Sequence, residues 1–219
     1  MLACQVTTSI RHRYRAQVRD EVKRAALRQL ADGGPQALSI NAIAKELGVS
    51  GPALYRYFAG RDELLTELVV DAYDDLGSAL GDAAAGGPGR AARERLRAVA
   101  RAYRDWAIGQ PHRYRLLFGE PVPGYDAHAE RLVDASRHAM NVLVDVLGND
   151  DLEAPPAALS RELERWARSR QIDVSAPVAL RAIEVWARLH GFVSLEIGGN
   201  FASMGLDADK LFRAELERF

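Results

Sequence analysis

Apolar side chains recur every three or four residues along most of this 219-residue chain. That spacing places them on one face of an α-helix, whereas a half-buried β-strand would alternate apolar and polar residues. The pattern therefore predicts an all-α protein. The expected helices span residues 16–32, 40–47, 51–58, 62–82, 90–109, 111–118, 125–148, 156–170, 175–198 and 207–218.

The segment SINAIAKELGVSGPALYRYFAGRDELL has the local chemistry of two helices joined by a tight turn. Ser39 stands at a helix N-cap, where its hydroxyl can accept a backbone N–H. Gly48 suits the positive φ of a helix-ending turn, and Val49 is placed to fill the angle between the helices. Ser50 caps the second helix, and Pro52 falls in its first turn, where a missing N–H costs nothing. These features predict a helix-turn-helix motif.

The second helix of this motif has one buried face and one free face. Leu54 and Phe58 are four residues apart and point to the core. Small residues at the start of the helix would let its backbone approach base edges in a DNA major groove. The residues left for the other faces are Gly51, Pro52, Ala53, Tyr55, Arg56 and Tyr57.

This stretch resembles the signature of the TetR family of transcriptional regulators. The resemblance lies in the capped helix, the glycine turn, the run Leu54–Phe58 and the basic Arg61, and it covers residues 15–65. Tyr57 stands where the family often has His, and Arg61 where it often has Lys, but both side chains can still hydrogen-bond a phosphate. The resemblance implies a three-helix DNA-binding domain, which we place at residues 16–62.

The expected DNA contacts fall into two groups. Phosphate contacts, which set the register on DNA, are expected from Ser39, Ser50, Tyr57 and Arg61. Groove-facing positions are Gly51, Pro52, Ala53, Tyr55 and Arg56. Arg56 is the best candidate for a bidentate contact to guanine.

The charge distribution supports a DNA-binding surface independently. Residues 1–61, the basic head, contain ten Lys or Arg and four Asp or Glu, a net charge of +6. The remaining residues contain nineteen Lys or Arg and twenty-six Asp or Glu, a net charge of −7. The overall charge of −1 therefore hides a basic N-terminal part and an acidic remainder. A basic surface attracts DNA because neutralising phosphates releases counterions.

The first fifteen residues are expected to form a basic, flexible arm. Arg11, Arg13 and Arg15 could reach the minor groove beside a major-groove helix, as cationic arms do elsewhere. The alternative is a solvated, disordered leader, because chain ends are usually poorly ordered.

Other features point to a cytoplasmic protein. No apolar core of signal-peptide length follows the N-terminal arginines. No apolar run approaches the roughly 20 residues that span a bilayer, so no membrane partner is expected. Cys4 is the only cysteine, which excludes an internal disulfide framework.

The C-terminal part carries a second resemblance. Trp186, His190 and Gly191, within VWARLHGFVSLEIGGNF, look like the WHG-type domain that follows many TetR-type heads. The segment 111–127 is also similar to a stretch common in that group. The resemblance implies that residues 63–219 form an all-α ligand-binding and dimerisation domain.

The same resemblance implies a homodimer and a small-molecule effector, with no cofactor. In the family the last two major helices form a four-helix interface, and the apolar candidates here are Val178, Ile183, Val185, Leu189, Phe192, Leu195, Leu211 and Leu216. The candidate effector pocket comprises Tyr103, Trp106, Tyr114, Phe118, Met140, Trp186 and His190. The alternative is that these aromatic side chains simply fill the core.

Catalytic and metal sites are not indicated. The five histidines show no HxxxH pair and there is no CxxC motif. Acidic pairs such as Asp74 and Asp75 are expected on solvated faces.

We therefore expect a sequence-specific regulator of transcription, most simply a ligand-responsive repressor that binds a palindromic double-stranded operator as a dimer, and not an enzyme. The alternative is a helical protein-interaction or small-molecule carrier module without regulated DNA binding.

The two groups of DNA contacts predict different defects. Arg56→Ala should lower the affinity for a preferred DNA sequence by about tenfold more than the affinity for other sequences, because it removes a base contact. Arg61→Ala should weaken binding to all DNA about equally and flatten its salt dependence, because it removes a phosphate contact. Binding titrations at several salt concentrations distinguish the two. Equal loss on every sequence from Arg56→Ala would remove it from the base-reading group.

Overall fold

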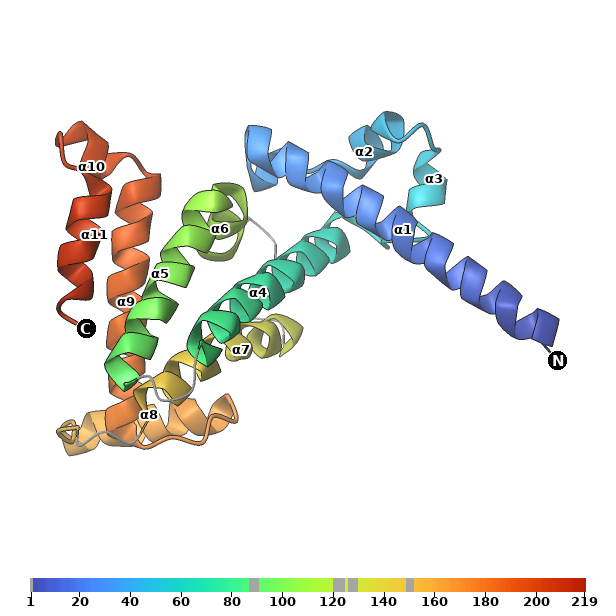
Figure 1. Ribbon diagram of the computed structural model, residues 1–219. Coiled ribbons are helices and arrows are strands. Elements are labelled where there is room, and N and C mark those ends of the chain that lie inside the picture. Colours follow the sequence, from blue (N-terminus) through green and yellow to red (C-terminus); the bar gives the residue numbers. More distant parts are fainter. Residues whose placement is uncertain (1, 87–90, 120–124, 126–129, 149–151) are drawn as a thin grey trace. The chain divides into compact units, whose positions relative to one another are not determined.

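The computed structural model describes residues 2–86, 91–119, 125, 130–148 and 152–219, without the side chains of residues 2–12 and 130. Every regular element in these ranges is helical, which confirms the predicted fold class (Figure 1). The elements are α1 (Leu2–Gly33), η1 (Pro35–Ala37), α2 (Ile40–Glu46), α3 (Gly51–Leu54), α4 (Arg61–Ala85), α5 (Ala92–Gly109), α6 (Pro111–Phe118), α7 (Glu130–Leu147), α8 (Ala157–Ser169), α9 (Ala176–Ile197), α10 (Asn200–Ser203) and α11 (Ala208–Leu216).

The chain divides into two compact units. The first comprises Met1–Asp71 and His112–Ala127, and the second comprises Ala72–Pro111 and His128–Phe219. The expected domain boundary after residue 62 falls inside the first unit, because α4 runs without a break and its first turns contribute to the core of that unit.

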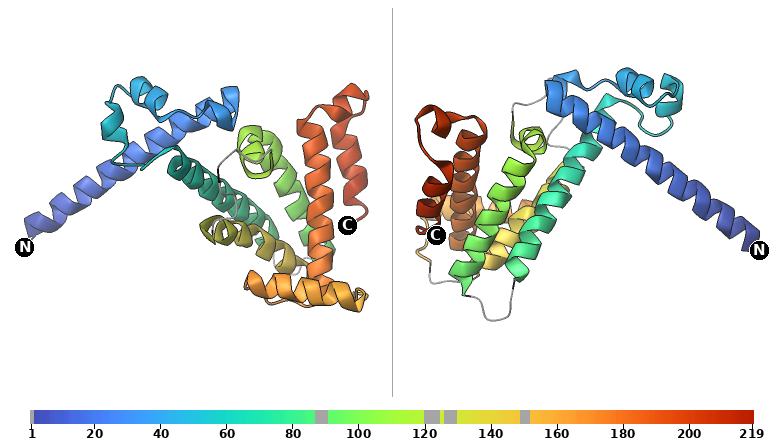
Figure 2. Two further views of the ribbon diagram at one scale, coloured as in Figure 1. Left: turned by 180° about the vertical axis from the view of Figure 1, so that it is seen from behind. Right: turned by 45° about the horizontal axis from the view of Figure 1, so that its top comes forward.

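Helix α1 is longer than the sequence pattern suggested. It begins at Leu2 and not near Ala16, so the segment expected to be a flexible arm is helical. The physical reason is that no glycine or proline precedes Gly33, and nothing in the chain interrupts the helix. The N-terminal half of α1 extends past α2 and α3 (Figures 1 and 2). The side chain of Arg11 lies outside the described residues.

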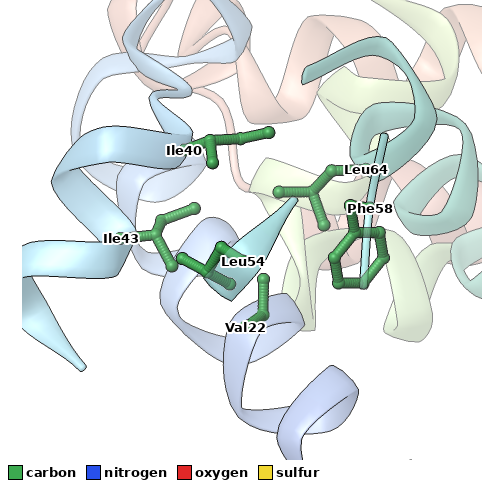
Figure 3. Close-up of a pocket in the computed structure, with 6 residues that line it drawn as sticks. All are labelled: Val22, Ile40, Ile43, Leu54, Phe58 and Leu64. Carbon is green, nitrogen blue, oxygen red and sulfur yellow. The ribbon is translucent and has the colours of Figure 1, made fainter. Parts of the chain in front are cut away.

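The core of the first unit is formed by the predicted apolar faces of α1, α2, α3 and α4. Figure 3 shows six of its side chains converging, Phe58 from the turn after α3 and the other five from the four helices. No space for a water molecule remains between them. Such close packing fixes the angles between short helices. The buried residues are Val22, Ala25, Ala26, Leu30, Leu38, Ile40, Ile43, Ala44, Leu54, Phe58, Leu64, Leu65 and Leu68.

In the second unit, α5, α7 and α9 pack against one another and α8 packs on α9. Helices α5, α9 and α11 run side by side in both views of Figure 2. A buried arginine joins these three helices. Arg104 of α5 donates from Nε and Nη2 to both carboxylate oxygens of Glu196, at 2.7 and 2.6 Å, and from Nη2 to Asp209 of α11 at 2.6 Å. Its guanidinium also lies over the ring of Phe212, with Cζ 4.9 Å from the ring centroid.

The Arg104 network predicts a large stability effect at one position. Arg104→Ala should lower the free energy of unfolding by about 3–5 kcal/mol, because it leaves the Glu196 carboxylate partly buried without its bidentate partner. The matched control is Arg28→Ala, whose pair with Glu46 is exposed and should be worth at most about 1 kcal/mol. Urea unfolding of both variants at one protomer concentration makes the comparison. Similar losses in the two variants would contradict a special role for Arg104.

Candidate nucleic-acid interface

The turn between α2 and α3 is built as the sequence predicts. The Ser39 hydroxyl accepts a hydrogen bond from the Ala42 amide at 3.3 Å, so the predicted N-cap is confirmed. The Ser39 amide donates to the side chain of Gln29 at 2.9 Å, which fastens the start of α2 to α1. Gly48 has a φ of 67°, a conformation that other residues resist. A Cβ atom on Gly51 would lie 3.3 Å from Asn41 Oδ1, so this glycine lets α3 approach α2 closely.

Two details of the turn differ from expectation. The side chain of Val49 is 44 % exposed, so it does not fill the angle between the helices. Leu47 packs against the core in its place. Ser50 does occupy the N-cap of α3, but among the described residues its hydroxyl makes no capping hydrogen bond, which leaves it available for a phosphate. Pro52 lies in the first turn of α3, as predicted.

Helix α3 is the recognition helix of the motif, and it is very short. Regular α-helix ends at Leu54, and a turn continues through hydrogen bonds from the Tyr57 and Phe58 amides to the Leu54 carbonyl, at 2.8 and 3.1 Å. Leu54 and Phe58 are buried, as predicted. Tyr55, which is 49 % exposed, and Arg56 face solvent. Of the small residues, Pro52 is exposed, whereas Gly51 and Ala53 are half-buried.

The other predicted phosphate contacts have roles within the fold as well. Tyr57 is half-buried and packs against the core. Arg61 Nη2 donates to the Pro35 carbonyl at 2.8 Å, and its Nη1 lies 3.6 Å from Asp62. A guanidinium carries five N–H donors, so the remaining ones can still bind a phosphate. Their contact with DNA stays a prediction.

Two arginines of α1 make local contacts that the sequence did not predict. Arg13 is exposed, as a DNA-contacting side chain would be. Arg15, expected to reach the minor groove, donates to the Arg56 carbonyl at 3.2 Å, and its contact with DNA stays a prediction. Arg19, which was not singled out, donates to the Tyr57 carbonyl. The signal that could have identified both is a spacing of four residues between basic side chains on α1.

Comparison with known proteins places this geometry in a family. The profile of the bacterial regulatory proteins of the tetR family matches residues 24–68. The profile of the tetracyclin repressor-like C-terminal domain matches residues 96–219. The HTH-type transcriptional regulator Rv1816 of Mycobacterium tuberculosis is 33% identical over 212 residues, which cover 92% of this chain and 90% of that protein. This chain belongs to the TetR family of transcriptional regulators.

Two solved structures share the fold of this chain. The crystal structure of SCO4313 has a TM-score of 0.82 and 43% sequence identity, and the match covers 94% of this chain and 97% of that one. The regulator FadR from Bacillus subtilis, solved in complex with stearoyl-CoA, has a TM-score of 0.62 and 16% sequence identity. That match covers 90% of this chain and 95% of the FadR chain. The TetR-type protein described here is therefore a DNA-binding transcriptional regulator with a helix-turn-helix.

The residues proposed to bind an effector in this TetR-type protein are divided between the two units. Tyr114 and Phe118 belong to the first unit and contact each other, with ring centroids 5.2 Å apart. Trp106 belongs to the second unit, where its indole N–H donates to Asp75 Oδ2 at 2.9 Å. Nε2 of the Gln110 side chain donates to the same oxygen at 2.9 Å, so Asp75 is not the solvated surface residue that we expected.

Five of the candidate residues, Trp106 among them, lie on the three helices that pack together in the second unit. Tyr103 is buried on α5, and Met140 is half-buried on α7. Trp186 and His190 lie one turn apart on α9 and stack, with ring centroids 5.4 Å apart and planes 22° from parallel. Burial lowers the pKa of the His190 imidazole, which favours its neutral form.

Two further observations concern other classes of site. Across the helices that the structure describes, none combines the length and apolar character of a membrane span. Within the same residues, no three His, Cys, Asp or Glu side chains gather as ligands for one metal ion.

The lowered pKa of His190 predicts a pH dependence of stability. The unfolded chain binds a proton at His190 near its ordinary pKa of 6.5, whereas the folded chain binds it only at lower pH. Stability is therefore fully present above about pH 7 and falls as the pH drops through and below 6.5. His190→Gln should reduce the loss of melting temperature on acidification. Part of the loss should remain, because burial also lowers the pKa of His112. An unchanged pH profile in the variant would contradict the assignment to His190.

Proposed function

We propose that this protein is a ligand-responsive repressor that binds a pseudo-palindromic operator as a homodimer in the cytoplasm. One observation carries the proposal: a short recognition helix presents exposed Tyr55 and Arg56, while Leu54 and Phe58 anchor its opposite face in the core. A helix of this kind can place two or three side chains against base edges, while the residues that anchor it in the core stay outside the groove. The net charge of +6 over residues 1–61 supplies the attraction to phosphates.

A homodimer is supported by exposed apolar side chains at one end of α9. Leu195 on α9, Met204 at the end of α10 and Leu206 just after it are 44, 63 and 46 % exposed. Other residues expected at the interface are buried within their own protomer, namely Val178, Val185, Leu189 and Leu216. Exposed apolar side chains that cluster on a surface are typical of subunit contacts. A twofold dimer would present two recognition helices to two half-sites about one or more helical turns apart.

An effector is best supported within the second unit, among Tyr103, Met140, Trp186 and His190. These side chains lie on α5, α7 and α9, which pack against one another. An aromatic pair with one imidazole suits an apolar ligand that carries a hydrogen-bonding group. Such a ligand would regulate DNA binding if it favoured a conformation in which α4 holds the recognition helices differently.

A titration of labelled DNA tests the proposal directly. Fluorescence anisotropy is measured on the intergenic DNA that flanks the protein's own gene, at about 150 mM salt with excess unlabelled competitor. We expect saturable binding with two protomers per site. Leu195→Glu should shift the protein toward monomers in sedimentation and should weaken operator binding. Stearoyl-CoA serves as a first effector probe, because a protein of the same fold was solved with it.

Three tests separate the alternatives. Binding that disappears with competitor on this DNA and on duplexes selected from a random library would support a carrier or protein-interaction module. Operator binding by a monomeric Leu195→Glu variant with unchanged affinity would contradict the proposed dimer. A thermal shift with an apolar ligand that Trp186→Ala abolishes would support the pocket, whereas an equal shift in this variant would contradict it.

A further inference from the structure

Three basic side chains on one face of α1 form a ladder that connects the recognition helix to α4. Arg15, Arg19 and Lys23 follow one another at intervals of four residues, which places them on one face of the helix. Two of them donate to backbone carbonyls just after α3, and two contact carboxylates of α4. The basic ladder lies entirely within the first unit.

Arg15 and Arg19 of the basic ladder hold the backbone at the C-terminal end of the recognition helix. Arg15 Nη2 donates to the Arg56 carbonyl at 3.2 Å, and Arg19 Nη1 donates to the Tyr57 carbonyl. The Arg19 guanidinium also lies over the ring of Phe58, with Cζ 4.3 Å from the centroid. Carbonyls at the end of a helix have no partners within it, so such donors fix the direction in which the chain leaves.

Arg19 and Lys23 of the basic ladder connect the same face of α1 to α4 through ion pairs. Arg19 Nη2 lies 3.1 Å from Glu67 Oε2, and Lys23 Nζ lies 3.2 Å from the same oxygen and 2.8 Å from Asp71 Oδ2. Glu67 and Asp71 are four residues apart, so the acidic spacing on α4 matches the basic spacing on α1. Glu67 and Lys23 have side chains only 14 and 16 % exposed, which limits screening of these pairs by salt.

Arg19 is the residue that joins the two ends of the basic ladder. Its two terminal nitrogens point to different elements, one to the Tyr57 carbonyl and the other to the Glu67 carboxylate. A planar guanidinium can hold both directions at once, whereas a lysine ammonium is a single point charge. A change at Glu67 on α4 is therefore transmitted to the backbone of the recognition helix through one side chain.

We propose that Arg19 and Glu67 are positioning residues for sequence recognition: they set the orientation of Tyr55 and Arg56 without touching the bases. The inference rests on the proposed role of α3 in DNA recognition. It assigns the specificity of this protein partly to a carboxylate, a group that on charge alone would repel DNA.

A negatively charged residue that supports DNA recognition can be tested by removing its charge, because charge alone predicts tighter binding and the proposal predicts weaker binding to the preferred sequence. Glu67→Ala and Glu46→Ala each remove one negative charge from a helix of the first unit, but Glu46 contacts only the exposed Arg28 among the ion pairs described. The probes are a duplex selected by the wild-type protein from a random library and an unrelated duplex of the same length. Glu46→Ala should tighten binding to both duplexes by the same factor, up to about threefold, because the protein becomes more positive.

Glu67→Ala should behave differently on the two duplexes. We expect binding to the unrelated duplex to tighten as in the control, and binding to the selected duplex to weaken by roughly tenfold, because misplaced base contacts are lost. Arg19→Lys should also lose discrimination while it keeps the wild-type salt dependence, since the charge is unchanged. Equal behaviour of Glu67→Ala and Glu46→Ala on both duplexes would overturn the proposal.

Amide hydrogen exchange provides a measurement that does not depend on DNA. Exchange at residues 55–58 should be faster in Glu67→Ala than in Glu46→Ala, at a temperature where circular dichroism shows both variants folded. Unchanged exchange would overturn the positioning role even if the variants bound DNA poorly. A wild-type protein that selected no sequence, with faster exchange in Glu67→Ala, would instead count against sequence recognition by α3 while upholding the mechanical connection.

Discussion

The shortness of the recognition helix is the constraint on which the arrangement of the first unit depends. A helix of four residues closes too few internal hydrogen bonds to persist alone, so its geometry must come from its surroundings. Leu54 and Phe58 supply that support from the core, and Gly51 allows close contact with α2. Arginines of α1 supply the rest by donating to the carbonyls of Arg56 and Tyr57 in the turn that follows α3. The exposed side chains proposed to face DNA are thereby held by three neighbouring helices.

Local chemistry made much of the first unit predictable. The N-cap at Ser39, the left-handed turn at Gly48 and the inward positions Leu54 and Phe58 each depend on residues within one or two turns of the chain. The errors arose where local rules are weak. Helix α1 began earlier than expected because no glycine or proline interrupts residues 2–15, and the expectation of a disordered chain end does not depend on the residues themselves. Val49 faced solvent because the adjacent Leu47 already filled the core.

Polar contacts between distant residues could not be predicted from the sequence. Arg104 and Glu196 are 92 positions apart, and neither differs in type from the many charged residues on the surface. Asp75 was expected in solvent, yet it accepts from both Trp106 and Gln110. Such pairings are decided by which helices pack together, and the apolar pattern of each helix does not specify its neighbour. For the same reason, a set of aromatic residues proposed as one pocket proved to be divided between two units.

The contacts at the end of the recognition helix are made to backbone carbonyls and not to the side chains of Arg56 and Tyr57. Every amino acid presents the same carbonyl, so substitutions at the exposed positions 55 and 56 would leave the support intact. A lineage could therefore acquire a new operator preference by exchanging one or two surface side chains, without compensating changes in α1 or α4. A change of DNA preference at these two positions therefore does not disturb the contacts that α1 makes with the backbone after α3.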